Sequence, residues 1–263
     1  MLVLGLALGG YVALVGTVYL AQRRLIYPRP RTVLRPRVHD ASLEQVPVPG
    51  APAAIGLYFA APRDGRTILH FHGNAEQVGD LIALGRAIRA RGLGFYAMEY
   101  PGYGDAEGAP SEQANYAAAE ATIEHLATRH GVGKQELVLQ GQSLGTGIAL
   151  EMAHRGHGSR IVLLSPYTSM VDMAKTILPI FPNELLLLDR YLNLSKAPSV
   201  LAPALVIHGT QDEVIPASMG ERVAKALPNA RLRLIEGAHH NDLFVHSGRS
   251  LLDEIEKFCG PEP

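Results

Sequence analysis

The chain of 263 residues has a single cysteine, no tryptophan and almost no net charge. Cys259 has no partner in the chain, which excludes an intramolecular disulfide framework and a cluster of thiolate metal ligands. The 24 Lys and Arg residues balance 25 Asp and Glu residues, so no surface of one sign is expected to bind nucleic acid. The hydrophobic content of 47% is ample for a sizeable core, in which we expect Cys259 to be a small filler near the last helix.

Charged residues are also absent from Leu2 to Ala21. A helix of this length, at about 1.5 Å per residue, would span the roughly 30 Å of a bilayer's hydrocarbon core. The sequence therefore predicts a single-pass transmembrane anchor over residues 1–22. A cleaved signal peptide is the alternative, but no basic segment precedes the apolar run and no clear small-x-small site follows it. Arginines are frequent from Arg23 to Arg37 and absent before the span, which predicts a catalytic domain in the cytoplasm.

Prolines are frequent between Arg29 and Pro52, so residues 23–52 are predicted to be an Arg- and Pro-rich connection with at most one short strand. Residues 53–263 are predicted to form the catalytic domain. Six short apolar runs there indicate buried strands: Thr67–His72, Phe95–Tyr100, Glu136–Gly141, Arg160–Ser165, Ala204–Gly209 and Arg231–Glu236. They alternate with amphipathic helical patterns over Val78–Ile88, Ala119–Leu126, Leu144–Met152 and Leu251–Phe258. This alternation predicts an α/β fold with a mainly parallel central sheet flanked by helices.

The interval between the fourth and fifth strands, residues 166–203, is too long for a simple crossover. It holds two apolar pieces separated by Pro182, and we expect a short helical insertion over the carboxyl ends of the strands. Ligands of α/β proteins bind at that edge, so the insertion would serve as an apolar cap lining an acyl pocket. Ordinary core helices are the equally weighted alternative.

The stretch Val138 to Gly147, VLQGQSLGTG, places Ser143 between two glycines where a strand gives way to a helix. Gly141-Gln142-Ser143-Leu144-Gly145 matches the nucleophile elbow G-x-S-x-G, in which a strained turn exposes the serine hydroxyl. A side chain at either glycine would collide with the neighbouring strand or helix. The spacing of the glycines fits neither a dinucleotide fingerprint nor a P-loop, and a tight turn without chemistry is the remaining alternative.

A serine nucleophile requires a histidine base and a carboxylate, which in this fold follow in the order Ser, Asp or Glu, His. Asp212 follows the fifth strand, with Glu213 as the fallback and a turn or helix-cap aspartate as the alternative. His239 and His240 both follow the sixth strand, and their spacing does not choose between them. A metal site is a less favoured interpretation, with ligands drawn from His239, His240, Asp242 and His246, or from His70 and His72.

The segment FHGNAE, Phe71 to Glu76, ends a strand and opens a helix. Backbone N–H groups of Asn74 or Ala75, together with that of Leu144, would form an oxyanion hole. We interpret His70 as a buried strand histidine. Together these residues predict acyl transfer by Ser143, which needs no metal and no organic cofactor.

In this order and spacing, FHGNAE, EYPGYGDAEGAPSE, GQSLGTG, SPYTSM, HGTQDEVIP and EGAHHNDL resemble the α/β-hydrolase superfamily, and within it the Bem46-like group of membrane-anchored serine hydrolases. The resemblance covers about Ile68 to Phe258, and the amino-terminal apolar span is similar as well. It implies a Ser-Asp-His triad, an acyl-enzyme intermediate and a carboxylic ester or thioester substrate, either a small molecule or a lipid.

Carried over by position, the resemblance selects His240, which directly precedes Asn-Asp, and assigns Asn74 to the oxyanion hole. The same segments supply the residues expected to contact substrate: His72, Gly73, Tyr103, Gln142 and Tyr167. Asp105 stands where many relatives have Ser or Thr, so no substrate preference is carried over from that loop. A serine peptidase, an acyltransferase and a non-catalytic membrane-tethered scaffold are the alternative functions on this fold.

Overall fold

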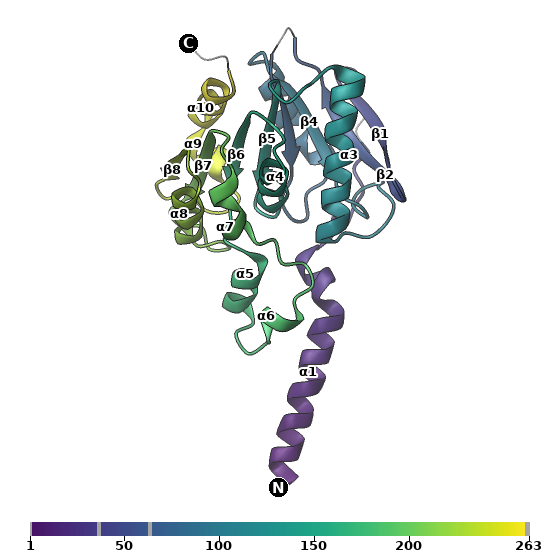
Figure 1. Cartoon of the computed structure of the whole chain (residues 1–263), viewed down its shortest axis with the longest axis vertical. Coiled ribbons are helices and arrows are strands. Elements are labelled where there is room, and N and C mark those ends of the chain that lie inside the picture. The colour runs from purple at the N-terminus through teal and green to yellow at the C-terminus, as the bar shows by residue number, and fades with distance from the viewer. Residues whose placement is uncertain (1, 36–37, 63–64, 261–263) are drawn as a thin grey trace.

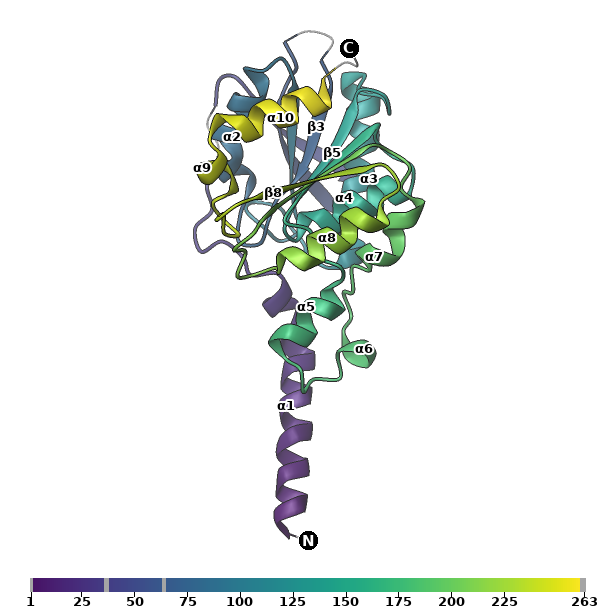
Figure 2. The same cartoon turned by 90° about the vertical axis from the view of Figure 1, so that its left-hand side faces the viewer.

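A sheet with helices on both faces forms the body of the protein, and one long helix projects from it (Figures 1 and 2). The computed structural model describes residues 2–35, 38–62 and 65–260, so that Arg37 of the arginine-rich segment lies outside the described residues. The sheet has eight strands in the order β1-β2-β4-β3-β5-β6-β7-β8. The pairs β1/β2 and β2/β4 are antiparallel, and every other neighbouring pair is parallel.

The six predicted strands are all present, within one residue of their expected ends. They are β3 (Thr67–Phe71), β4 (Gly94–Glu99), β5 (Leu137–Gln142), β6 (Arg160–Leu164), β7 (Ala204–Gly209) and β8 (Ala230–Ile235). All residues of β3, β4, β6 and β7 are buried, as expected of strands that are covered on both faces. The prediction of a mainly parallel α/β sheet is confirmed.

Two further strands, β1 (Ser42–Val48) and β2 (Ala51–Phe59), form a hairpin where at most one short strand was expected. Pro47, one of the prolines that suggested an irregular connection, is tolerated because β1 is an edge strand, where a missing N–H donor costs no ladder hydrogen bond. Pro47 is exposed, while its neighbours Val46 and Val48 are buried. The sheet therefore begins before residue 53.

Helices cover both faces of the sheet: η1 (Val78–Leu81), α2 (Ile82–Arg89), α3 (Glu112–His130), α4 (Gly145–His154), α8 (Ala217–Ala226), α9 (Leu243–Ser247) and α10 (Arg249–Cys259). The four predicted amphipathic segments lie in them, except that Leu144 is the N-cap residue before α4. Helix α3 begins where the Ser111 hydroxyl accepts a hydrogen bond from Ala114 N, and it ends at Gly131 in the left-handed conformation.

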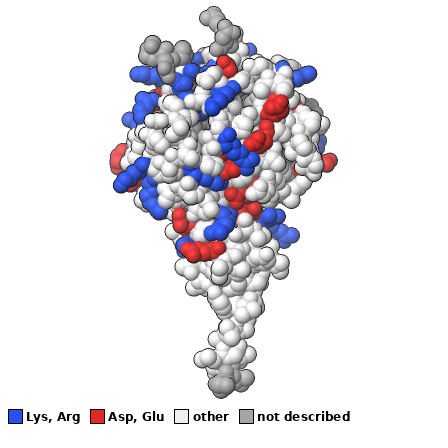
Figure 3. Space-filling view, viewed as in Figure 1, with Lys and Arg blue, Asp and Glu red and all other residues white. Residues whose placement is uncertain are grey.

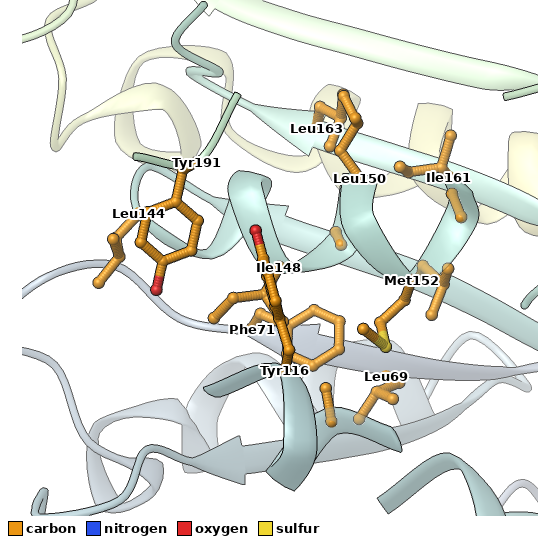
Figure 4. Packing of buried hydrophobic residues seen from close by; sticks show 14 of the residues in the cluster. Leu69, Phe71, Tyr116, Leu144, Ile148, Leu150, Met152, Ile161, Leu163 and Tyr191 are labelled. Carbon is orange, nitrogen blue, oxygen red and sulfur yellow. The ribbon is translucent and has the colours of Figure 1, made fainter. Parts of the chain in front are cut away.

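The strands divide the core into two clusters because successive side chains point to opposite faces. Leu69 and Phe71 of β3 pack with Tyr116 of α3 and with Ile148 and Met152 of α4 (Figure 4). Ile68, between them in sequence, packs in the other cluster together with α2 and α10. Cys259 is fully buried in that second cluster as the expected filler, and burial raises the pKa of its thiol to about 12.

Residues between β6 and β7 are helical, as predicted, in four short pieces: α5 (Met170–Ile177), α6 (Asn183–Leu186), α7 (Asn193–Lys196) and η2 (Ala197–Ser199). Helix α7 packs against α4 and α8. Helices α5 and α6 instead extend below the sheet and lie beside the projecting helix (Figures 1 and 2). The division of the chain into an anchor, a connection and a domain with a cap stays a prediction.

The projecting helix is α1 (Leu2–Ile26), which continues past the predicted anchor. An 18-residue apolar window within Val3–Ile26 has a mean hydropathy of 1.9, and this window is not buried against the rest of the described chain. By length and composition α1 is a candidate membrane span.

Candidate active site

Ser143 occupies the sharp turn between β5 and α4. Its φ of 50° lies in the left-handed region, which residues other than glycine rarely adopt. Hydrogen bonds hold the turn in place: Ser143 N donates to Leu164 O of β6 at 2.9 Å, and Thr146 N donates to Ser143 O at 3.0 Å. The surrounding fold therefore holds Ser143 in a backbone conformation that it would rarely adopt in an isolated peptide.

The flanking glycines are required by close packing, as the sequence predicted. A Cβ added at Gly141 would collide with the Gly145 carbonyl oxygen, and one added at Gly145 would collide with the Phe71 carbonyl oxygen of β3. Both obstacles are backbone atoms, which no rotamer change can move. Strand β5 and helix α4 can approach this closely only with glycine at both positions.

We expect Gly145→Ala to lower the free energy of unfolding by about 3 kcal/mol, because the methyl group must displace β3 or α4. Gly133→Ala is the matched control, since its added Cβ meets only the Glu136 carboxylate at 3.0 Å, the end of a flexible side chain. Denaturant unfolding of the full-length protein in detergent measures both. Equal losses would contradict the packing argument.

His240 and Asp212 lie beside Ser143, each in the loop after its strand. His240 Nε2 is 3.0 Å from Ser143 Oγ, and His240 Nδ1 is 2.8 Å from Asp212 Oδ2. With the proton on Nδ1, the imidazole donates to Asp212 and leaves Nε2 free to accept the hydrogen bond of the serine hydroxyl. The structure thus brings together three residues that are up to 97 positions apart.

Asp212 is held at both of its oxygens. Oδ1 accepts hydrogen bonds from Val214 N at 3.0 Å and Ile215 N at 2.7 Å, while Oδ2 lies 3.2 Å from His208 Nε2 as well as beside His240. Burial alone would raise the pKa of Asp212, but the hydrogen bonds from His208, His240 and Ile215 outweigh it and lower the pKa. The carboxylate is therefore charged at neutral pH. Asp212 thus stabilises a turn through Oδ1, as one prediction held, and lies beside His240 through Oδ2, as the other held.

The adjacent histidine has different surroundings. His239 Nδ1 lies 3.0 Å from Glu213 Oε2, and both side chains are more than half exposed at the surface. His240 is buried and points inward to Ser143. The geometry therefore agrees with the selection of His240, and it leaves Glu213, the fallback for Asp212, outside the hydrogen-bonded chain.

The loop after β3 lies over the same serine. A Cβ added at Gly73 would be 3.6 Å from Ser143 Cβ, so this backbone passes directly beside the hydroxyl. Gly73 N donates to Glu76 Oε2 at 2.7 Å, and Ala75 has a φ of 61°, which fixes the turn through Asn74. Leu144 is the N-cap residue of α4, where N–H groups lack partners within the helix. An oxyanion hole of Asn74 and Leu144 stays a prediction.

Two family models match this chain: one described as serine aminopeptidase, S33, over residues 63–193, and one described as alpha/beta hydrolase fold, over residues 183–247. An uncharacterized protein of Mycobacterium tuberculosis is 35% identical over 206 residues, which are 77% of this chain and 73% of that protein. Alpha/beta hydrolase domain-containing protein 17C of Xenopus tropicalis is 34% identical over 219 residues, or 80% of this chain and 67% of that protein. The chain belongs to the α/β-hydrolase superfamily.

A solved structure supports this assignment at the level of the fold. An esterase of Pyrococcus furiosus superposes on the α/β-hydrolase with a TM-score of 0.71 at 14% identity, covering 88% of this chain and 97% of the esterase. The sequence resemblance to the superfamily is therefore confirmed, and so is the fold that it implied.

Three residues expected to contact substrate are buried in this α/β-hydrolase. His72, Tyr103 and Tyr167 each have a relative exposure of 1% or less. His72 stacks on Tyr100 with ring centroids 4.0 Å apart, and its Nε2 lies 3.2 Å from the buried Glu99 carboxylate. These contacts fix the His72 ring within the core. Direct contact of His72, Gly73, Tyr103, Gln142 or Tyr167 with a substrate stays a prediction.

Sequence reasoning missed the residues that hold the loops in place. His208 stands four positions before Asp212 at the end of β7, and the Glu99 carboxylate accepts a hydrogen bond from Val78 N at 3.1 Å. A polar residue inside an apolar strand pattern was the available signal for both. The pattern does not identify the partners of Glu99, because Val78 and His72 belong to a different segment. Nor does it show that the His208 ring turns toward Asp212 in the loop after β7.

Five residues of the metal interpretation have hydrogen-bond partners in this α/β-hydrolase: His70, His72, His239, His240 and Asp242. His70 Nδ1 is 2.9 Å from Gln140 Oε1 in the core, and burial lowers the pKa of His70 to about 3, so its ring is neutral at physiological pH. Among the residues that the structure describes, only Glu44, His125 and His130 cluster closely enough to hold a metal ion. They lie on β1 and α3, and they share no residue with the Ser143 site.

Proposed function

We propose that this α/β-hydrolase is a serine hydrolase that cleaves carboxylic ester or thioester bonds, with Ser143 as nucleophile, His240 as general base and Asp212 as its orienting carboxylate. The observation that carries the proposal is the hydrogen-bonded chain Ser143 Oγ, His240 Nε2, His240 Nδ1 and Asp212 Oδ2, with spacings of 3.0 and 2.8 Å. The strained turn at Ser143 supports it as well, because such strain persists where the surrounding fold maintains it for function.

In the proposed first step Ser143 Oγ attacks the acyl carbonyl carbon while His240 Nε2 accepts the hydroxyl proton. The ionised Asp212 stabilises the imidazolium that forms and fixes the ring through Nδ1. His240 then gives its proton to the leaving alcohol or thiol, and an acyl ester of Ser143 remains. The lowered pKa of Asp212 supports its role as a permanent negative charge.

Water completes the cycle by the same route. His240 Nε2 takes a proton from a water molecule that attacks the acyl carbonyl, and the carboxylic acid leaves as Ser143 recovers its proton. In both steps the carbonyl oxygen gains negative charge. The N–H groups of Leu144 and Asn74 would hold it, and one such donor contributes on the order of 3 kcal/mol to the transition state. No cofactor or metal takes part in this cycle.

The direct test uses p-nitrophenyl esters with acyl chains from C2 to C16 and full-length protein in detergent. We expect turnover with an optimum at one chain length, which would report the length of the acyl pocket. The same series as thioesters ranks the two substrate classes. Absence of turnover across both series would contradict the proposal.

A serine peptidase is the second candidate, and one observation favours it: a matching family model is described as serine aminopeptidase, S33. An aminoacyl p-nitroanilide and the corresponding ester separate the candidates. Because an activated ester is intrinsically more reactive than an anilide, both candidates favour the ester, and the anilide is the substrate that discriminates. We expect anilide turnover no higher than that of Ser143→Ala, and Ser143-dependent anilide turnover would favour the peptidase. Transfer to an added alcohol would identify an acyltransferase.

We further propose that α1 anchors the enzyme in a membrane with the catalytic domain in the cytoplasm. The apolar run Leu2–Ala21 is followed by Arg23 and Arg24 in the last turn of α1 and by Arg29, Arg31 and Arg35 beyond it, as the positive-inside bias requires. A protease added to intact cells is expected to leave the domain uncut and to digest it once the cells are opened. Digestion in intact cells would reverse the assignment.

A further inference from the structure

The insertion exposes large apolar side chains to an unusual degree. Relative exposure is 70% for Ile177, 62% for Ile180, 85% for Leu185 and 50% for Leu188. From Thr176 to Leu188 the sequence has one charged residue, Glu184, whose carboxylate pairs with Lys175 Nζ at 2.6 Å. An exposed apolar surface of this kind marks an interaction site rather than an ordinary protein surface.

This apolar segment, residues 176–188, is fixed against α1 by polar contacts. The Tyr11 hydroxyl donates to Ile180 O at 2.8 Å, Gln22 Nε2 donates to Leu186 O at 3.2 Å, and Leu188 N donates to Gln22 Oε1 at 2.8 Å. Tyr11 and Gln22 are about 16 Å apart along a helix that rises about 1.5 Å per residue. The segment therefore lies beside the half of α1 nearest the domain (Figures 1 and 2).

Those contacts place the segment at the depth of a membrane leaflet when α1 spans the bilayer. A contact zone of about 16 Å is about half of a hydrocarbon core of roughly 30 Å. Figure 3 shows the tapering lower part of the molecule largely free of charged side chains, while the domain above carries both signs. The ion pair of Arg23 with Asp189, at 3.0 Å, lies at the domain end of this zone.

Several backbone N–H groups of the apolar segment donate hydrogen bonds within the protein, and lipid favours such internal pairing in an irregular segment. Phe181 N donates to Leu178 O, Asn183 N donates to Phe181 O, and Leu187 N donates to Asn183 O. The Tyr11 hydroxyl and Gln22 Nε2 of α1 donate to the carbonyl oxygens of Ile180 and Leu186. Pro179 and Pro182 have no N–H to satisfy. These internal hydrogen bonds lower the cost of moving the segment out of water.

From these observations we propose that residues 176–188 insert into the acyl region of the same leaflet as the domain-side half of α1, so that the lipid bilayer is the partner of this surface. The insertion follows the carboxyl end of β6, and Ser143 follows that of its neighbour β5. The edge of the sheet that bears the serine therefore faces the membrane. The substrate class that follows is an acyl ester dissolved in the bilayer, and this step rests on the proposed hydrolase activity.

Depth-dependent fluorescence quenching tests the insertion without any activity measurement, so failure of the proposed hydrolase leaves the result intact. Full-length Leu185→Cys is labelled with a small fluorophore and reconstituted in phosphatidylcholine vesicles that contain lipids with a nitroxide on the acyl chain. Buried Cys259 makes the wild-type protein the blank. Leu6→Cys in α1 is the positive control, and Leu201→Cys, 71% exposed before β7 at the opposite edge of the sheet, is the negative control.

We expect acyl-chain nitroxides to quench the label at Leu185 at least about three-fold more than the label at Leu201, and nearly as strongly as the label at Leu6. Aqueous iodide is expected to show the reverse order. Equal quenching by lipid at Leu185 and Leu201 would overturn the proposal. Protection of Leu185 from both quenchers would overturn it as well, because a protein and not lipid would then cover the segment.

Discussion

Ser143→Ala is expected to lower kcat/KM for a p-nitrophenyl ester by about 10⁴-fold or more, the loss associated with removing a triad nucleophile. The substitution deletes only the hydroxyl oxygen that lies 3.0 Å from His240 Nε2. The backbone hydrogen bond from Ser143 N to Leu164 O is independent of that oxygen, so we expect the elbow to stay folded. Steady-state kinetics and a thermal unfolding scan on the same preparation measure the two effects.

The chain offers a matched control for this substitution in Ser165. Like Ser143 it follows a strand of the sheet, is buried and has a positive φ, here 49°. Its hydroxyl has no hydrogen-bond partner among the described residues. We expect Ser165→Ala to change kcat/KM by less than about three-fold. Equal activity in wild type and Ser143→Ala would contradict a serine nucleophile at this site, whatever the control shows.

His240→Ala is expected to lower kcat/KM by about 10⁴-fold or more, because an unassisted serine hydroxyl is a poor nucleophile. His239→Ala, one position earlier, is expected to stay within about two-fold of wild type. His239 faces Glu213 at the surface, whereas His240 Nε2 lies beside Ser143 Oγ. The pair of substitutions therefore compares two adjacent histidines on one loop, in the same assay.

The double substitution Ser143→Ala with His240→Ala tests whether the two residues act together. If the two residues act as one unit, the double variant loses about as much activity as either single variant. Additive losses in kcat would show that they act separately. A large loss in His239→Ala with an active His240→Ala would transfer the base to His239 and would contradict the geometry described above.

The sequence could predict the elbow and the parallel strands because each is encoded locally. Gly141 and Gly145 flank the serine in a fixed pattern, and the buried strands are continuous apolar runs. Asp212 and His240 could be predicted for a related reason: in a parallel sheet, the loops after β7 and β8 leave the same edge as the loop after β5. Family resemblance resolved the choice between His239 and His240, which local pattern could not.

Other features depend on pairings between distant segments. Pro47 in β1 makes that stretch of sequence look irregular when it is considered alone. The strand is possible because it lies at the edge of the sheet beside β2. The contact of Glu99 with His72 forms only once β3 and β4 lie side by side. The direction taken by α5 and α6 is likewise set by contacts with α1, such as that of Tyr11 with Ile180, more than 160 residues away.

The most direct test of the account is the covalent reaction of the full-length protein with a fluorophosphonate probe, followed by peptide mass spectrometry. The probe reports an activated serine without assuming any substrate. We predict one adduct, located on Ser143, that is absent from Ser143→Ala and strongly reduced in His240→Ala. A folded wild-type protein that takes up no probe, or an adduct on a different serine, would contradict the assignment of Ser143 as the nucleophile.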